Sequence, residues 1–295
     1  MNEIEILNTI ENIVGTEFIG DDCAFLKDFG IVVTQDSLVE NIHFKRSWCS
    51  PEQLGYKSVI VNISDVFASG AIPRYVTISL SLPNNVDNNF VEEFYKGACN
   101  ALYGAKIVGG DITGSKSDIM VSITAIGDTK NRYISSRKNA LDGYIIVTSG
   151  NHGSSALGLN ELACNGKNIE LIKEHLEPKL EYEFADSIAT TVKEKYAMMD
   201  TSDGLGDALF KIAEASNVKI VVDYDKLPHL SIASYEQVLF GGEDYKLVAA
   251  IPKKYLKIIK NAVVIGEVQS YDGIRLDVSG KKYTNYNELN VFNHF

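Results

Sequence analysis

The sequence of 295 residues has few cysteines and no long apolar run. Its four cysteines, Cys23, Cys49, Cys99 and Cys164, are widely spaced and form no CxxC pair. This spacing is typical of reduced thiols and excludes a disulfide framework or a zinc site. No apolar run approaches the roughly 18 residues that a membrane helix needs, and the acidic N-terminus does not resemble a secretory signal. We therefore expect a cytoplasmic protein with no membrane partner.

Positive charge is also scarce. The chain has 28 Lys and Arg residues against 39 Asp and Glu residues, which gives a formal net charge of −11. Binding to a nucleic-acid backbone needs clusters of basic side chains, so we expect no nucleic-acid partner. The motifs GxxxxGK[ST], GxGxxG, HExxH and GxSxG are all missing, which excludes the nucleotide-binding loops, metalloproteases and hydrolases that they identify.

The remaining composition is that of a globular protein, since 45% of the residues are hydrophobic and 23% are charged. The length suits two domains of about 100–200 residues each. Helical and strand periodicities occur in both halves, which indicates a mixed α/β (α+β) fold. Around 129–142 the sequence is polar and has no strong period. We therefore predict domains at 1–138 and 139–295.

Apolar periodicity and capping residues place the expected elements. Ser50 and Pro51 begin a helix, with Gln53 three residues after the cap. The predicted helices are 3–14, 51–69, 90–104, 153–165, 181–195 and 204–216. The predicted strands are 30–36, 75–83, 118–128, 143–150, 218–223, 245–251, 262–268 and 273–278.

Acidic side chains recur in short motifs rich in Gly, Ser and Thr. Each motif by itself also fits a turn, and DTSDG also fits a cap in which Asp or Ser accepts the first N–H groups of the next helix. GGDITG has the glycines of a phosphate-binding loop but an acid at its centre. The motifs are IGDD (19–22), TQDSLVENIHF (34–44), NISD (62–65), GGDITG (109–114), DTSDG (200–204) and GGEDY (241–245).

Several carboxylates in one acidic protein favour a metal site. Carboxylates that are brought together repel and raise one another's pKa. Mg²⁺ removes this cost, and it binds through carboxylates together with substrate phosphates. We therefore interpret the acid of GGDITG as a metal ligand beside a glycine backbone that a nucleotide approaches. His43 follows Asp36 of the TQD motif by seven residues. Taken alone, a single histidine is more often structural than functional, so this spacing does not by itself assign His43 a role.

In their order along the chain, these motifs resemble those of the thiamine-monophosphate kinases, of the superfamily that includes aminoimidazole ribotide synthetase. The resemblance spans nearly the whole chain and rests on GDDCA (20–24), TQDSLVENIHF (34–44), NISDVFASGAIP (62–73), GGD (109–111), SRKNALDG (136–143), DTSDG (200–204) and GGEDY (241–245). It implies a two-domain fold whose N-terminal sheets pair across a homodimer. The sheet edges at 30–36 and 118–128 are the expected places for that pairing.

The resemblance also implies a set of site residues. It implies that ATP and thiamine monophosphate (TMP) are the substrates and that several Mg²⁺ ions assist the transfer of the γ-phosphoryl group of ATP directly onto the phosphate of TMP. The implied metal ligands are Asp22, Thr34, Gln35, Asp36, Asp65, Asp111, Asp200 and Asp203. The implied ATP contacts are Tyr103, Gly110, Asp111, Arg137 and Ser202, and the implied substrate contacts are His43, Glu243 and Phe292. The implied catalytic residues are Asp36, Asp65, Asp111 and Arg137.

Three positions depart from the family pattern. Gln35 stands where the family commonly has Thr or Ser, Ile112-Thr113 follows GGD, and Asp142-Gly143 reverses the usual order. Two alternatives remain open. One is a sister enzyme of the superfamily, such as selenophosphate synthetase, aminoimidazole ribotide synthetase or the hydrogenase-maturation dehydratase. The other is a catalytically silent nucleotide-binding scaffold, although the acids that the motifs require are all present.

Overall fold

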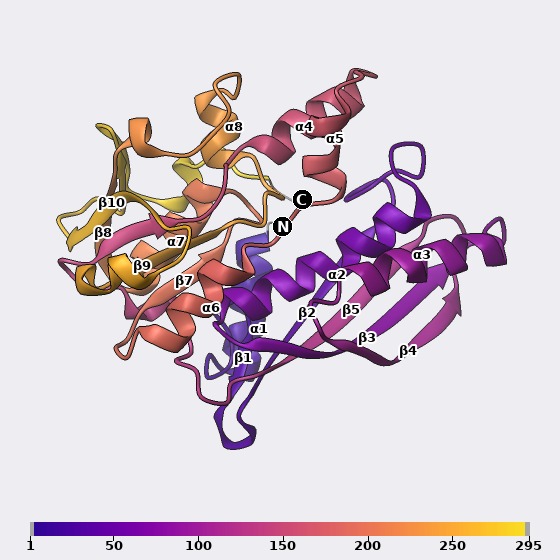
Figure 1. Cartoon of the computed structure of the whole chain (residues 1–295), viewed down its shortest axis with the longest axis horizontal. Coiled ribbons are helices and arrows are strands. Elements are labelled where there is room, and N and C mark those ends of the chain that lie inside the picture. Colours follow the sequence, from indigo (N-terminus) through magenta and orange to yellow (C-terminus); the bar gives the residue numbers. More distant parts are fainter. Residues whose placement is uncertain (1–2, 293–295) are drawn as a thin grey trace.

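The computed structural model describes residues 3–292 and contains two β-sheets with helices packed around them (Figure 1). Within this range, no helix has both the length and the apolar character to cross a bilayer. The α-helices are α1 (Glu3–Val14), α2 (Pro51–Ala68), α3 (Asn88–Asn100), α4 (Ser154–Ala163), α5 (Ile169–Leu176), α6 (Tyr182–Thr191), α7 (Leu205–Ala215) and α8 (Tyr235–Phe240). The strands are β1 (Ala24–Leu26), β2 (Ile31–Val39), β3 (Ile72–Leu82), β4 (Lys106–Gly114), β5 (Met120–Asp128), β6 (Ile145–Thr148), β7 (Ala197–Asp200), β8 (Val218–Val222), β9 (Leu247–Ile251), β10 (Val263–Ser270), β11 (Leu276–Val278) and β12 (Lys281–Tyr283).

The first sheet has the strand order β1-β2-β5-β3-β4, and only its β3–β4 pair is parallel. In β2, Val32 and Leu38 are buried, and Thr34 and Asp36 between them share their face because side chains alternate along a strand. Helices α2 and α3 lie on one side of this sheet (Figure 1). The sequence of β2 therefore directs one hydroxyl and one carboxylate toward α2.

Helix α2 lies between the two sheets. Ser50 and Gln53 form the predicted capping box, and Pro51 occupies the first turn. The helix packs against β2 and β5 on one side and against β7 and α6 on the other. Glycine permits its close approach to α3, because a Cβ atom at Gly55 would lie only 1.9 Å from the carbonyl oxygen of Phe94. Burial on nearly all sides explains why α2 lacks a clear polar face.

The second sheet has the strand order β12-β11-β8-β10-β6-β9-β7. Its strands β6, β9 and β7 are buried at every position, so they are almost continuously apolar rather than alternating. In β9, for example, Leu247 and Ala249 join the core that contains α2 and α6, whereas Val248 and Ala250 join the core under α7 and α8. The first of these cores contains residues from both halves of the chain, so the two sheets are held together by shared apolar packing.

The structure confirms the mixed α/β architecture and most of the expected elements, and it corrects two expectations. GGDITG forms the second half of β4 and is not a loop. The segment 118–128 contains β5, which is an inner strand between β2 and β3 and not a sheet edge. The open edges of the first sheet are β4 and the part of β2 beyond its pairing with β1. Short elements that the sequence did not indicate include β1, α5, β7, α8 and β12.

Candidate active site

Three carboxyl groups from distant parts of the chain meet beside α2. Asp22 precedes β1, Asp65 lies in α2, and Asp200 ends β7. One oxygen atom of each lies within 4.8 Å of the others. Because all three donors are carboxylate oxygens, the set fits a hard divalent cation such as Mg²⁺. The structure therefore brings three of the residues predicted to bind metal into one acidic cluster.

Hydrogen bonds hold the acids around this cluster in place. The Thr34 hydroxyl donates to Asp65 Oδ2 at 2.6 Å, and the Ser64 hydroxyl donates to Asp200 Oδ2 at 2.6 Å. The backbone N–H of Asp36 donates to Asn62 Oδ1 at 3.0 Å. Thus the polar residues of NISD lie inside a helix and connect both sheets to the cluster. The sequence motif contained Asn62 and Ser64, but it did not indicate these roles.

The acidic cluster is electrostatically unfavourable without a cation. Burial raises the pKa of Asp22, Asp36, Asp65 and Asp200, and neighbouring carboxylates raise each of them further. Burial, followed by the charge of Asp22, raises the pKa of Asp200 to about 7. The pKa of Asp65 lies well above its usual value because of burial and then Asp36. A bound divalent cation would reverse this penalty, since it favours the ionised form of each acid.

Arg137 lies beside the cluster, between the two halves of the chain. Its Nη2 atom donates to Asp22 Oδ1 at 2.5 Å, and its backbone N–H donates to Asp21 at 2.7 Å. Its Nε atom is buried and has no hydrogen-bond partner among residues 3–292. Arg137 therefore has a donor left for a ligand that enters this site.

DTSDG turns from β7 into α7. Ser202 N donates to Asp200 Oδ1 at 3.4 Å, and Asp203 Oδ2 lies 3.2 Å from Lys211 Nζ. The N-cap of α7 is Gly204, which provides no side-chain hydrogen bond. The interpretation of DTSDG as a side-chain cap is therefore wrong, and its two aspartates are directed to the site instead.

Other residues predicted for the site lie away from the acidic cluster within one chain. Asp111 and Gly110 are on β4, which is three strands from β2 in the sheet order, or about 14 Å at the usual strand spacing. The side chain of Gln35 contacts Ser122 and Thr124 on the sheet face opposite α2. The Tyr103 hydroxyl accepts a hydrogen bond from the backbone N–H of Leu180 at 3.3 Å.

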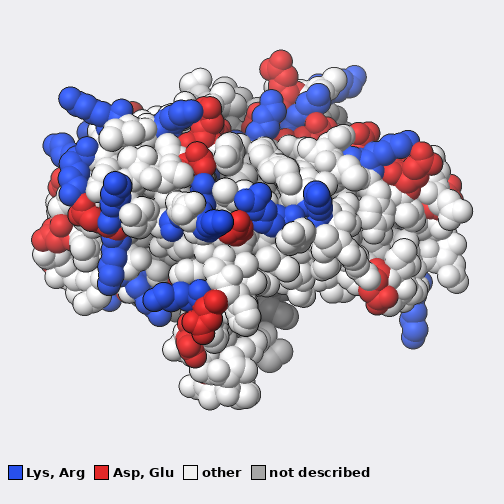
Figure 2. Space-filling model, turned by 60° about the horizontal axis from the view of Figure 1, so that its bottom comes forward, with Lys and Arg blue, Asp and Glu red and all other residues white. Residues whose placement is uncertain are grey.

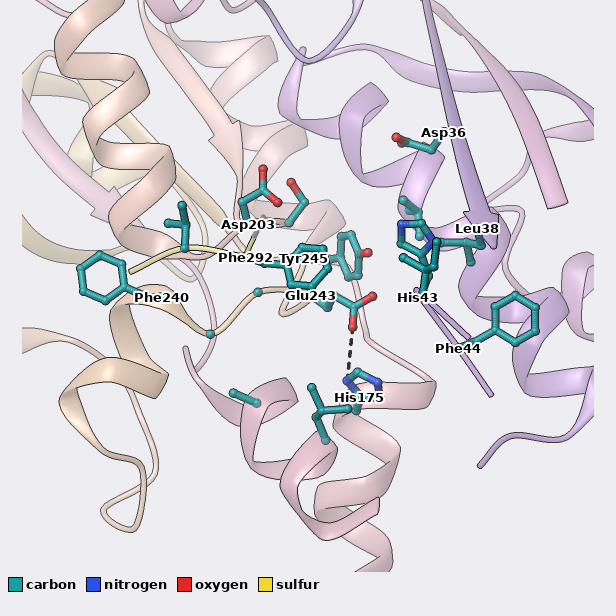
Figure 3. A pocket seen from close by; sticks show the side chains of 18 of the residues that line it. Asp36, Leu38, His43, Phe44, His175, Asp203, Phe240, Glu243, Tyr245 and Phe292 are labelled. Carbon is teal, nitrogen blue, oxygen red and sulfur yellow. Dashed lines mark ion pairs between the residues drawn. The ribbon is translucent and has the colours of Figure 1, made fainter. Parts of the chain in front are cut away.

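A cavity of about 590 Å³ opens directly beside the acids. Asp36 and Asp203 line it together with His43, Glu243 and Phe292. Figure 3 shows these side chains gathered around one space, with the Tyr245 ring beside Phe292. His43 is held by its Nδ1 atom, which accepts a hydrogen bond from the Val39 N–H at 2.9 Å. The three residues predicted to contact substrate thus lie in one aromatic and acidic pocket.

The GGEDY segment holds its side chains with an unusual backbone. Glu243 and Tyr245 have φ angles of 65° and 49°, which are uncommon for residues other than glycine and often occur at functional sites. The Glu243 N–H donates to the Ser202 carbonyl at 2.6 Å. Asp244 accepts hydrogen bonds from the N–H groups of Gly153 and Ser155 at the start of α4. Alternating side chains of this segment therefore enter the pocket, while Asp244 anchors it.

Fold and site together define a member of the AIR synthase related proteins. The family model of their N-terminal domain matches residues 20–129, and that of their C-terminal domain matches residues 142–279. The predicted boundary at 138/139 falls between the two matches.

Known relatives narrow the class further. A thiamine-monophosphate kinase of Aquifex aeolicus is 34% identical and covers 96% of this chain and 95% of its own length. The enzyme of the same name from Bacillus subtilis is 33% identical and covers 82% of this chain and 79% of its own length. The chain belongs to the thiamine-monophosphate kinase family.

A solved structure agrees with this assignment. It is described as AaThiL complexed with AMPPCP and TMP, and it superposes with a TM-score of 0.90 at 32% identity. The superposition covers 100% of this chain and 97% of that chain.

Proposed function

We propose that this chain catalyses the ATP-dependent phosphorylation of TMP to thiamine diphosphate. One observation carries the proposal: an acidic cluster suited to Mg²⁺ adjoins a pocket that combines a carboxylate with aromatic side chains. The first feature suits two polyphosphate substrates, and the second suits an organic cation. The names of the relatives support the same activity. The solved complex with AMPPCP and TMP supports the pair of substrates.

The acidic residues would hold the metal ions. Asp22, Asp65 and Asp200 form the centre of the set, and Thr34, Asp36 and Asp203 extend it toward the pocket. Bound Mg²⁺ would neutralise phosphate charge, which matters because two unit charges at about 4 Å repel by roughly 4 kcal/mol at an effective dielectric constant near 20. The acids themselves are held in position by Ser64, Asn62 and Thr34 before any ligand binds.

The proposed reaction does not require a side chain that acts as a general base. The acceptor is a phosphate oxygen, and the second pKa of a phosphate monoester is about 6, so it is ionised near neutral pH. The task of the protein is then to align donor and acceptor and to stabilise charge. We assign Arg137 to the ATP phosphates because its buried Nε donor lacks a partner among the described residues. Ser202 lies at the same turn as the metal-directed acids and is assigned to ATP as well.

The pocket would recognise the thiamine part of TMP. Its thiazolium ring is a cation, and a carboxylate with nearby aromatic faces suits such a group. Glu243 supplies the carboxylate, and His43 and Phe292 line the same cavity (Figure 3). The phosphate of TMP would then point toward Asp36 and Asp203, at the end of the cavity where the acids lie.

We also propose a homodimer formed by the first sheet. Strand β4 is a free edge whose residues are largely exposed, and free edges favour pairing with another strand. Figure 2 shows a broad uncharged stretch over the right half of the molecule, where this sheet lies in Figure 1. Pairing of β4 with the open part of β2 in a second copy would bring Asp111 and Gly110 to the acidic cluster of the partner subunit.

One assay tests the activity. Purified protein is incubated with ATP, Mg²⁺ and TMP, and the products are scored for thiamine diphosphate and ADP. We expect one thiamine diphosphate for each ADP, with none formed when Mg²⁺ is chelated. ATP turnover with a different acceptor and none with TMP would favour a sister enzyme. Absence of any ATP turnover would favour the nucleotide-binding scaffold.

A further inference from the structure

A buried lysine lies behind the substrate pocket. Lys57 belongs to α2, and its side chain is only 4% exposed. Its Nζ atom lies 3.1 Å from Glu243 Oε2. A charged lysine is rarely buried unless it is paired. The carboxylate of Glu243 therefore compensates the buried charge of Lys57, and Lys57 in turn holds that carboxylate in place.

His175 from α5 completes the arrangement. Its Nε2 atom lies 3.4 Å from Lys57 Nζ, and its Nδ1 atom lies 3.0 Å from Ser155 Oγ and 3.5 Å from Glu243 Oε2. A protonated lysine can only donate, so Nε2 accepts and the ring proton is on Nδ1. Burial, followed by the charge of Lys57, lowers the pKa of His175 to about 4. The ring is therefore neutral near pH 7 and presents its N–H toward Ser155 and Glu243.

The contacts leave part of Glu243 available to a ligand. Both Lys57 and His175 approach the same oxygen, Oε2, and Glu243 lines the cavity (Figure 3). Burial raises the pKa of Glu243, but the charge of Lys57 and the polar contacts of the carboxylate outweigh it, so the pKa lies below its usual value. The other oxygen atom, Oε1, therefore belongs to an ionised carboxylate and can accept a contact from a ligand in the cavity.

The three residues also come from both sides of the pocket. Lys57 belongs to the first half of the chain, whereas Glu243 and His175 belong to the second half. The ion pair therefore fixes the acid relative to His43, which is on the same side as Lys57. A carboxylate on a strained loop (φ 65°) would otherwise be free to turn toward solvent.

We propose that Lys57 and His175 are positioning residues that act through Glu243 to set the affinity of the pocket for the cationic substrate. This inference rests on the proposed function, because TMP is the cation that the pocket is proposed to bind. Lys57 contacts Glu243 and is not among the residues that line the cavity. Its removal should therefore weaken TMP binding and leave ATP binding unchanged.

Steady-state kinetics of Lys57→Met test the inference. We expect the KM for TMP to rise about tenfold or more, the size of one charge-assisted hydrogen bond. The KM for ATP and the kcat at saturating TMP should change less than twofold. Lys96→Met, which removes an exposed ion pair with Glu92 on α3, is the control and should change neither KM. His175→Asn keeps an N–H near the position of Nδ1 and should bind TMP more tightly than His175→Leu.

A double-mutant cycle separates positioning from a structural role. In the Glu243→Gln background, Lys57→Met should cause no further rise in the KM for TMP, and the double variant also avoids an unpaired buried charge. An equal rise in both backgrounds, or no rise in either, would overturn the inference. If the wild-type protein forms no thiamine diphosphate, the proposed function fails and this inference fails with it. An active wild type with an unaffected Lys57→Met variant refutes the inference alone.

Discussion

Replacement of Asp65 by Asn is the most direct test of the acidic cluster. Asn has nearly the same shape, and its Oδ1 atom can still accept the hydrogen bond from Thr34. The change therefore removes one negative charge and little else. Because Asp65 is partly buried and its carboxylate lies within 4.8 Å of those of Asp22 and Asp200, that charge is the quantity under test.

The structure sets the expected size of the effect on stability. Two full charges within 4.8 Å repel by about 3 kcal/mol at an effective dielectric constant near 20. Burial and the neighbouring carboxylates raise the pKa of Asp65 and so disfavour its ionised form, and Asn therefore relieves only part of this repulsion. We expect the metal-free variant to gain up to about 1 kcal/mol, or about 2–4 °C in Tm. Mg²⁺ should stabilise the wild type more than the variant.

The effect on catalysis should be much larger. A metal ion stabilises the transition state of phosphoryl transfer by several kcal/mol, so loss of one ligand should lower kcat by about 10³-fold. The assay is formation of thiamine diphosphate over a range of Mg²⁺ concentrations, with thermal unfolding measured on the same samples. The control is Asp272→Asn, which removes an exposed carboxylate paired with Lys219. Near-normal kcat at saturating Mg²⁺, or a large fall in the metal-free Tm, would refute the reasoning.

Three further predictions follow from other parts of the site. His43→Ala should raise the KM for TMP and leave the KM for ATP unchanged, and a change confined to ATP would contradict its place in the pocket. Asp200 has a raised pKa of about 7, so the folded metal-free protein binds more protons than the unfolded chain, and stability should fall as pH rises from about 4 to about 7. Asp200→Asn should remove this part of the slope of Tm against pH, and an unchanged slope would show that Asp200 ionises normally. Ile112→Glu, at an exposed position of β4, should yield monomers by light scattering and lose activity, whereas an active monomer would exclude a shared site.

Local sequence signals determined much of the fold. The capping box at Ser50 and Gln53 fixed where α2 begins, because its hydrogen bonds are made within four residues. Alternation of Val76, Ile78 and Leu80 located the buried face of β3. The strand β7 escaped prediction because its four residues are all buried, and α8 escaped it because a helix of six residues is too short to show a period. Continuous apolar runs of four to six residues fit a strand and a buried helix equally well.

The residue types of the site could be predicted from the sequence, but their proximity in space could not. The motifs predicted that Asp22, Asp65 and Asp200 bind metal, and the fold brought these three together from three different elements. GGDITG was interpreted correctly as an acid beside glycines but incorrectly as a loop, since its pairing partner β3 lies about 30 residues away in the chain. Pairing over such a separation leaves no local periodic signal.

By itself, the sequence determined the kinds of groups available: oxygen ligands in place of thiols, an arginine in SRKNALDG, and the residues His43, Glu243 and Phe292 that the family resemblance assigned to the substrate. Only the tertiary structure decided which of these groups share one space. Packing of α2 between the two sheets put Asp65 between Asp22 and Asp200, and it put Lys57 behind Glu243. A lysine within an apolar helix has no sequence signature of its purpose, because its partners are more than 100 residues away. Because Lys57 is buried, its charge has to be compensated by these partners rather than by water.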